Sequence, residues 1–244
     1  MGKITVVGIG PGSLIDMTER AKTAIAQAEV IVGYHTYIEL IKPLIEGKNI
    51  IGTGMKQEVD RCKAAIDAAL TQNVVVVSSG DSGVYGMAGL VLEMVLNLPK
   101  EERPTFDVIS GVSAVNAAAA VLGAPLMHDF AVISLSDLLT PWEVIVKRVE
   151  CAAQADFVIA LYNPKSHKRI KNIELVQQII LKYRKPSTPV GIVTGASRDN
   201  QSKIISTLEN FINEEINMFS LVIIGNSTTF VKENYMITPR GYTL

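Results

Sequence analysis

The sequence predicts an α/β fold made of two α/β domains, and three observations carry that prediction. Short apolar runs of strand length alternate with longer segments that place apolar residues at helical spacing. Residues 74–77 are valines throughout, as expected of a central strand in a parallel sheet that is covered on both faces. The alternation breaks at Gly123, Ala124 and Pro125 and then resumes. We therefore expect domains at residues 1–125 and 126–244, a hinge near residues 123–130, and a cofactor cleft between the domains.

The elements follow in order from apolar periodicity. In the first half we expect strands at residues 4–8, 30–32, 74–77 and 106–109. The helices expected there cover residues 17–28, 59–70, 84–96 and 113–122. In the second half we expect strands at residues 131–135, 157–161, 189–193, 203–207 and 221–224, with helices at 141–153 and 170–183. Pro141 suits a first helical turn, and the short gap between 193 and 203 predicts an antiparallel hairpin.

Composition excludes several classes of partner. The 244 residues are 48% hydrophobic and 19% charged, which is ordinary for a soluble α/β enzyme. The net charge of −1 gives no field that attracts nucleic acid or an anionic membrane, so we expect neither as a partner. Cys62 and Cys151 have no metal or redox spacing. There is no secretory signal and no apolar stretch of about 20 residues, so we expect a cytoplasmic protein.

Two strands end in glycine-rich turns, at residues 8–12 and 79–83. Glycine has no Cβ and tolerates positive φ, so such turns let the backbone approach a nucleoside closely. The dinucleotide fingerprint is incomplete, because Ser13 stands at the third glycine position and the second strand ends in Gly33 and Tyr34 instead of an acid. Pro11 removes an N–H that a phosphate would use, and no P-loop motif occurs. The turns favour a nucleoside without phosphates, and a plain strand-to-helix turn is the alternative for the first.

A set of motifs in register extends this interpretation. They are residues 8–12, 79–81 with 84–86, 110–114, 128–130 with 133–137, 161–166 and 225–227. Together they resemble the tetrapyrrole methylases, which use S-adenosylmethionine, from about residue 3 to residue 230. The segments 52–58, 85–89 and 161–166 are most similar to the members that methylate C17 of the precorrin-3 macrocycle and contract its ring. One departure is Ser82, where the family commonly has proline after Gly80 and Asp81.

The resemblance implies the residues that bind S-adenosylmethionine. They are Gly10, Pro11, Ser79, Gly80, Asp81, Val84, Ser113, Ala114, Asn163 and Ala196. The Asp81 carboxylate would meet the cofactor's ammonium group or ribose, and its alternative role is a turn residue that bonds its own backbone. Ser113 is equally suited to cap the helix that follows it.

The resemblance also implies a tetrapyrrole substrate with several carboxylates, which needs cations nearby. Lys56, Lys165 and Arg198 are the substrate-binding candidates, beside Lys168 and Arg169, and a solvated charged surface is the alternative. Asp16, His128 and Asp129 are the catalytic acid–base candidates, with Asp137 behind them. A structural hydrogen-bonding pair is the alternative for His128 and Asp129. His35 and His167 have no partner at metal-ligand spacing, so we expect no protein-held metal.

The function expected from the resemblance is C17 methylation of precorrin-3B or cobalt-factor III, with ring contraction, in cobalamin biosynthesis. The alternatives are another tetrapyrrole methylase that acts on a different ring carbon, and a nucleoside-binding module without catalysis. A nicotinamide oxidoreductase is disfavoured by the incomplete fingerprint. The resemblance further implies a homodimer. The apolar residues 117–122 suit either an interface or a core, and we favour the core.

Overall fold

The structure is a computed structural model that describes residues 2–166 and 170–243. The chain forms two compact units, Met1–Ala114 and Val115–Leu244. The division falls at the start of helix α5 (Ala114–Leu122), earlier than the expected boundary at residue 125. Helix α5 belongs to the second unit because Leu122 is fully buried against Gly191 there. The break in the sequence pattern at Gly123 corresponds instead to a two-residue strand, β6 (Gly123–Ala124), whose first residue, Gly123, has φ +125°.

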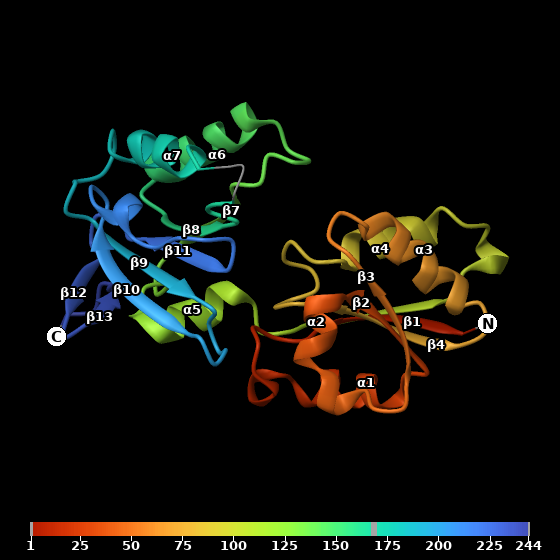
Figure 1. Ribbon diagram of the computed structural model, residues 1–244. Helices are drawn as coiled ribbons and strands as arrows, with labels where there is room; N and C mark the ends of the chain where they lie inside the picture. Colours follow the sequence, from red (N-terminus) through yellow and green to blue (C-terminus); the bar gives the residue numbers. More distant parts are fainter. Residues whose placement is uncertain (1, 167–169, 244) are drawn as a thin grey trace. The chain divides into compact units, whose positions relative to one another are not determined.

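The first unit is built on a five-stranded parallel sheet in the order β3-β2-β4-β1-β5 (Figure 1). Its strands are β1 (Lys3–Gly8), β2 (Val30–Tyr34), β3 (Asn49–Thr53), β4 (Asn73–Ser78) and β5 (Thr105–Ile109). Strand β4 is central and pairs with both β1 and β2, and its valines alternate between the two faces. This confirms the doubly covered parallel sheet predicted from residues 74–77.

Helices cover both faces of this sheet (Figure 1). On one face, α1 (Glu19–Gln27) and α2 (His35–Leu40) pack with Val7, Val75 and Val77. On the other, α3 (Glu58–Ala68) and α4 (Ala88–Leu96) pack with Ile4, Val74 and Val76. Short 3-10 turns occupy Leu14–Asp16, Lys42–Leu44 and Lys100–Glu102. Thr18 caps α1 by accepting from the Ala21 N–H, as expected for a helix start.

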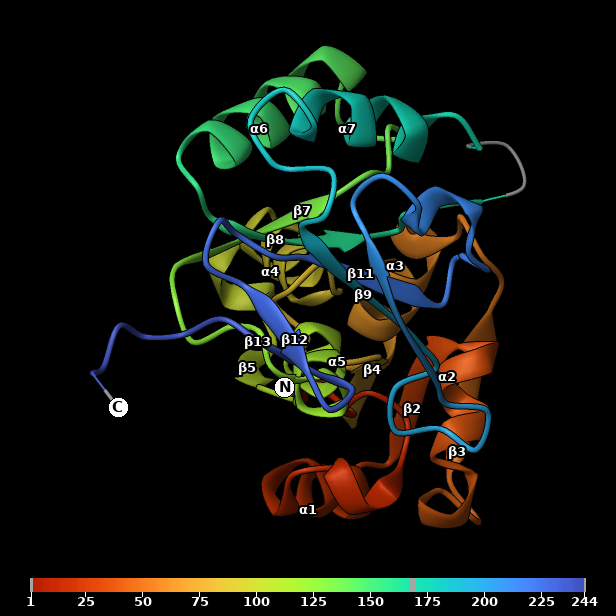
Figure 2. The same cartoon turned by 90° about the vertical axis from the view of Figure 1, so that its left-hand side faces the viewer.

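The second unit contains a mixed five-stranded sheet in the order β10-β9-β11-β8-β7. Its strands are β7 (Phe130–Ser134), β8 (Val158–Tyr162), β9 (Pro189–Thr194), β10 (Ser202–Thr207) and β11 (Ser220–Ile224). Strands β9 and β10 form the predicted antiparallel hairpin, while β7 and β8 are parallel. Helices α6 (Trp142–Gln154) and α7 (Asn172–Ile180) lie side by side over one face (Figure 2). Strands β12 (Phe230–Lys232) and β13 (Tyr235–Ile237) extend β6 into a small separate sheet, after the 3-10 turn Phe211–Asn213.

Several element predictions are wrong in detail, for physical reasons. The helix expected from residue 84 begins at Ala88, because Tyr85 has φ +52° and cannot join a right-handed helix. Strand β3 and helix α2 were missed, since β3 ends in Gly52 and Thr53 and α2 has only six residues. The apolar stretch in α5 lies in the core as favoured, with Ala118 and Leu122 fully buried.

No helix in residues 2–166 or 170–243 is both long and apolar enough to cross a membrane.

Candidate functional site

The glycine-rich turns of the first unit follow β1 and β4, which are neighbours in the sheet. The helix after β1 is α1, on one face of the sheet, and the helix after β4 is α4, on the other face. The connections therefore diverge to opposite faces at this pair of strands. In open α/β sheets, ligands bind outside the carboxyl ends of the strands at such a switch point. The topology favours the same turns that the sequence indicates.

The two turns are joined directly by their backbones. The Gly10 N–H donates to the Gly80 carbonyl at 3.1 Å, and the Gly80 N–H donates to the Gly10 carbonyl at 2.7 Å. Both glycines have positive φ, +78° and +66°, which residues with a Cβ rarely adopt. Because these amides bond each other, Gly10 and Gly80 shape the site through their backbone path and not by offering an unused N–H to a ligand.

A third turn, residues 110–114 after β5, packs against the other two. A Cβ built on Gly111 would lie 2.2 Å from the Gly80 carbonyl oxygen, and one on Gly8 would lie 2.6 Å from the Gly111 nitrogen. A Cβ built on Gly80 would lie 3.6 Å from the Ala114 nitrogen. The structure thus gathers most of the expected cofactor residues at one edge of the first sheet: Gly10, Pro11, Ser79, Gly80, Asp81, Val84, Ser113 and Ala114.

Asp81 ties these turns together. Its Oδ1 accepts from the Gly83 N–H at 2.8 Å, and its Oδ2 accepts from the Gly111 N–H at 3.0 Å. The first bond is the local turn that the sequence offered as the alternative role of Asp81. The second fastens the turn after β4 to the turn after β5. Each carboxylate oxygen accepts more than one hydrogen bond, so Asp81 can accept a further bond from a ligand while it keeps its bonds to Gly83 and Gly111.

The three turns carry one negative charge. Residues 9–13, 79–83 and 110–114 contain one charged side chain, that of Asp81. An anionic ligand such as a phosphate would find a carboxylate here and no cation. The turns suit a ligand whose reacting portion is neutral or positively charged.

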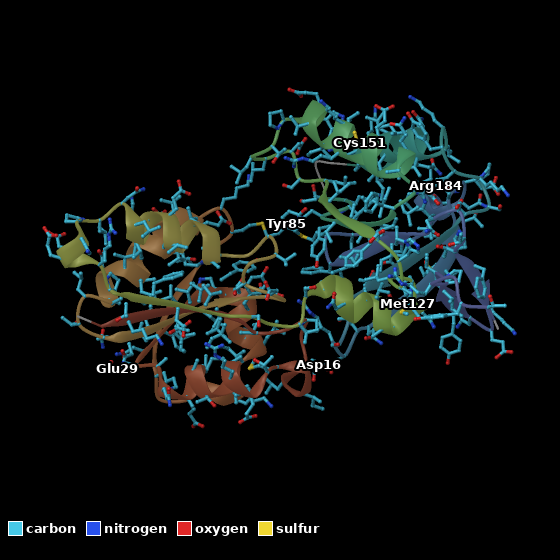
Figure 3. The ribbon with its side chains drawn as sticks, turned by 180° about the vertical axis from the view of Figure 1, so that it is seen from behind. Asp16, Glu29, Tyr85, Met127, Cys151 and Arg184 are labelled. Carbon is cyan, nitrogen blue, oxygen red and sulfur yellow. The ribbon has the colours of Figure 1, made fainter. Side chains whose placement is uncertain are left out.

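Asp16 lies beside the same turns, in the 3-10 turn after β1. Its carbonyl oxygen would be 3.1 Å from a Cβ on Gly10. Asp16 and Tyr85 both lie at the end of the first unit that is opposite to Glu29, which precedes β2 (Figure 3). Asp16 is therefore an acid–base candidate that the structure keeps near the expected cofactor residues.

Large apolar side chains stand exposed at this edge. Ile15 follows β1, Met55 follows β3, and Tyr85 follows β4, with exposed fractions of 89%, 55% and 56%. Exposed apolar residues gathered in this way are typical of a surface that binds a ligand or another protein.

Sequence reasoning missed Arg61, on α3. Its side chain is only 4% exposed, although it lies at the carboxyl ends of β2 and β3. Nε donates to Thr53 Oγ1 at 2.7 Å, Nη2 donates to the Gly54 carbonyl at 3.0 Å, and Nη1 lies 3.5 Å from Met87 Sδ. An available signal was overlooked: Arg61 falls in the buried stripe of α3 that Cys62, Ala65 and Ile66 define. An arginine in an apolar stripe indicates a buried polar function.

Lys56 and Cys62 lie close to Arg61 in the sequence and differ in exposure. Lys56, a predicted substrate residue, is exposed in the turn after β3 with φ +65°. Burial raises the pKa of the Cys62 thiol to about 11, with Arg61 lowering it and Glu58 raising it further. Cys62 is therefore protonated near neutral pH and unsuited to act as a nucleophile.

In the second unit, the remaining cofactor and substrate candidates share one edge. Strands β8 and β9 both run antiparallel to β11, so their carboxyl ends lie together. Asn163 follows β8 with φ +50°, and its Nδ2 donates to Ser134 Oγ at 2.9 Å. Ala196 follows β9, and Arg198 stacks on the Phe219 ring at 5.8 Å. Lys165 lies in the segment after β8, beyond Asn163.

His128 and Asp129 lie elsewhere. They precede β7, which is parallel to β8, so they stand at the edge of the second sheet opposite to Asn163. His128 Nδ1 accepts from the Asp129 N–H at 3.0 Å, and the Asp129 carbonyl accepts from Val158. The local pairing matches the structural alternative for these two residues. Asp137 follows β7 and is at the same edge as Asn163.

Besides His128, the chain has two histidines, His35 and His167. His35 is exposed, and its ring packs over Gly52 in β3. His167, Lys168 and Arg169 lie outside the described residues. Elsewhere in the described chain, no three His, Cys, Asp or Glu side chains gather as metal ligands.

The motif at residues 225–227 has a structural role. It follows β11, whose carboxyl end lies at the edge opposite to Asn163. Arg184, 1% exposed, donates to the Gly225 and Phe157 carbonyls and contacts Asp156 Oδ1 at 3.2 Å. Burial lowers the pKa of Arg184, and Asp156 opposes that shift. Asp156 in turn accepts from the Ser227 N–H and hydroxyl.

Comparisons with known proteins found related sequences and a related structure. Residues 3–212 match the model of the tetrapyrrole (corrin/porphyrin) methylases. The cobalt-factor III methyltransferase of Priestia megaterium is 52% identical over 99% of this chain, which spans 45% of that protein. The probable cobalt-factor III C(17)-methyltransferase of Salmonella typhimurium is 50% identical over 99% of this chain and 100% of its own length. The crystal structure of the methyltransferase CobJ matches with a TM-score of 0.92 at 35% identity, covering 98% of this chain and 100% of that one.

Proposed function

The chain belongs to the tetrapyrrole (corrin/porphyrin) methylases, and we propose that it transfers a methyl group from S-adenosylmethionine to C17 of a precorrin-3-type macrocycle. The reaction contracts the ring and belongs to cobalamin biosynthesis. The observation that carries the proposal is the 50% identity, over its full length, to a probable cobalt-factor III C(17)-methyltransferase, joined to switch-point turns whose one charged side chain is Asp81. Between the two substrates, cobalt-factor III is preferred over precorrin-3B, since both curated relatives above are named for cobalt-factor III.

The cofactor fits the charge of the turns after β1, β4 and β5. S-adenosylmethionine supplies a methyl group already activated on a positively charged sulfur. The turns hold no cation that would repel this charge, and Asp81 offers a carboxylate to the ammonium group or ribose. The close backbone walls come from Gly10, Pro11, Ser79, Gly80, Val84, Ser113 and Ala114. Asn163 and Ala196 stay cofactor candidates on the resemblance. Positioning of donor and acceptor carbon is the main catalytic task.

The macrocycle fits the rest of the first sheet's edge. Its flat apolar ring suits Ile15, Met55 and Tyr85, and its carboxylates suit Lys56. Lys165 and Arg198 stay candidates for binding the substrate's carboxylates. Among the acid–base candidates, Asp16 is retained, because His128 and Asp129 lie at the other edge of their sheet. The protein acts as a cytoplasmic homodimer in this proposal, without nucleic acid or membrane.

The test is an anaerobic incubation of the purified protein with S-adenosylmethionine and either cobalt-factor III or precorrin-3B, followed by mass spectrometry. The expected product is heavier by one methylene group, has a lactone-type spectrum, and forms faster from cobalt-factor III. Methylation at another ring position would indicate a different member of the family. Binding of S-adenosylhomocysteine without turnover of either macrocycle would favour a nucleoside-binding module.

A further inference from the structure

Among the described residues, each unit has one buried arginine, Arg61 or Arg184, and their surroundings differ. In the second unit, Arg184 contacts the Asp156 carboxylate at 3.2 Å, so its charge has a counter-ion. In the first unit, Arg61 takes part in no ion pair with any residue that the structure describes. Its acceptors are a hydroxyl, a carbonyl and a thioether, all of them neutral. Within the described residues, Arg61 is thus a cation more than nine-tenths buried that has no anionic partner.

Such an arrangement is costly on physical grounds. A guanidinium has five N–H donors, and the three contacts of Arg61 use one each from Nε, Nη1 and Nη2. One of these acceptors, Met87 Sδ, is weak. Burial of a charge is strongly unfavourable unless an opposite charge and a full set of hydrogen bonds compensate it. The folded chain alone leaves this compensation incomplete.

The location of Arg61 indicates what completes it. Thr53 ends β3, Gly54 follows it, Tyr34 ends β2, and Met87 lies between β4 and α4. The guanidinium also lies 6.0 Å from the centre of the Tyr34 ring. The contacts of Arg61 therefore come from the carboxyl edge of the first sheet, from its β2–β3 side and, through Met87, from the segment after β4. The same edge carries the Asp81 carboxylate on its β4–β5 side, through the bond to Gly111.

We propose that Arg61 binds a side-chain carboxylate of the macrocycle. The inference rests on the function proposed above and divides its site by charge: the Asp81 side receives the cationic cofactor, and the Arg61 side receives the anionic substrate. The carboxylate takes the Nη1 and Nη2 donors in a bidentate contact and replaces the weak Met87 acceptor. The exposed turn of Met55 and Lys56, which begins at the Gly54 carbonyl, is the entrance.

The experiment measures macrocycle binding without turnover. Cobalt-factor III is titrated into the protein in the presence of S-adenosylhomocysteine, and its Kd is read from visible absorbance. The variants are Arg61→Met, which removes the charge, and Arg61→Lys, which keeps the charge but not the planar fork. The matched control is Arg184→Met, which removes the buried arginine of the other unit. Thermal unfolding and the Kd of S-adenosylhomocysteine are measured for each.

The Arg61→Met variant is expected to weaken macrocycle binding by about 10- to 100-fold, as for loss of a charge-assisted hydrogen bond. The Arg61→Lys variant is expected to lose about 3- to 10-fold, because lysine cannot bind a carboxylate bidentately. Both keep the S-adenosylhomocysteine Kd within about twofold of the parent. Arg184→Met is expected to lower the unfolding temperature and leave the macrocycle Kd unchanged. Arg61→Lys supplies the decisive comparison if Arg61→Met does not fold.

An unchanged macrocycle Kd in folded Arg61 variants would overturn the inference and leave Arg61 as a structural brace of the Gly54 turn. Equal weakening by Arg184→Met would also overturn it, because the effect would then follow from stability alone. A parent protein that binds neither cobalt-factor III nor precorrin-3B would refute the proposed function itself. The two failures are therefore distinguishable.

Discussion

The carboxyl edges of the two sheets are built differently. In the first sheet, backbone meets backbone: Gly10 and Gly80 exchange two hydrogen bonds, and Gly111 lies against the Gly80 carbonyl where no Cβ fits. In the second sheet, the Leu135 N–H donates to the Tyr162 carbonyl at 2.9 Å, and side chains make further contacts. Asn163 donates to Ser134, and the hydroxyls of Thr194 and Ser220 bond at 2.7 Å. The turns of the first edge depend on glycines that have no Cβ, with the Asp81 carboxylate joining two of the turns, whereas the second edge depends on several side chains.

This difference indicates how each edge responds to substitution. A backbone contact has no rotamer that relieves a clash, so Gly8 and Gly111, where a Cβ would lie within 2.6 Å of a backbone atom, tolerate no added atom. A side-chain hydrogen bond contributes about 0.5–1.5 kcal/mol, and its loss leaves room for water or a rotamer change. We therefore expect large effects on the first edge and graded ones on the second.

The largest effect is expected for Gly111→Ala. The new Cβ would lie 2.2 Å from the Gly80 carbonyl oxygen, so the turns after β4 and β5 must separate. We expect a loss of about 3 kcal/mol or more in the free energy of unfolding, at the upper end for an overpacked site, together with loss of S-adenosylhomocysteine binding. Urea denaturation and calorimetric titration measure the two quantities.

The control for this substitution is Gly89→Ala, on α4. No atom lies within 4 Å of a Cβ built on Gly89, so alanine is expected to be neutral or to stabilise by up to about 1 kcal/mol. Equal destabilisation by both substitutions would contradict the backbone-contact explanation.

Asp81→Ala is expected to have the next largest effect. The substitution removes the acceptor of the Gly83 and Gly111 N–H groups. We expect the free energy of unfolding to fall by about 1–3 kcal/mol and S-adenosylhomocysteine affinity to fall by about tenfold or more. Unchanged affinity in a folded protein would restrict Asp81 to its turn-forming role. Asp81→Asn, which keeps one acceptor but not the charge, separates the two contributions.

On the second edge, Asn163→Ala is expected to cost less. The variant loses the hydrogen bond to Ser134 and places alanine at φ +50°. We expect a loss of about 1–2 kcal/mol in the free energy of unfolding. Asn163→Gly relieves the backbone strain and should recover part of the loss. If Asn163→Gly and Asn163→Ala were equally stable, the positive φ would carry no cost.

The smallest effect is expected for His128→Ala. The imidazole accepts from the Asp129 N–H at an exposed site, at the edge of the sheet opposite to Asn163. We expect kcat and KM of methyl transfer to stay within about twofold of the parent, as for a surface substitution. A tenfold fall in kcat with an unchanged unfolding temperature would return His128 to the catalytic candidates.

The contrast between the two carboxyl edges also explains which features the sequence predicted and which it did not. The order of strands and helices follows apolar periodicity, and the first edge follows from glycine spacing, since Gly10, Gly80 and Gly111 have backbone roles that no other residue fills. The edge to which a residue belongs depends on strand direction, so His128 was expected among the catalytic residues although it precedes β7 and lies at the edge opposite to Asn163. Arg61 falls in the apolar stripe of α3, a signal that was overlooked, but its surroundings of neutral groups follow only from the structure.

The most direct test of the proposed site is a crystal structure of the protein with S-adenosylhomocysteine. We expect the ligand against Gly10, Pro11, Ser79, Gly80 and Asp81, with its amino group or ribose within hydrogen-bond distance of the Asp81 carboxylate. A ligand bound on the β2–β3 side of the sheet, next to Arg61, or away from the carboxyl edge altogether, would contradict the assignment of the glycine-rich turns to the cofactor.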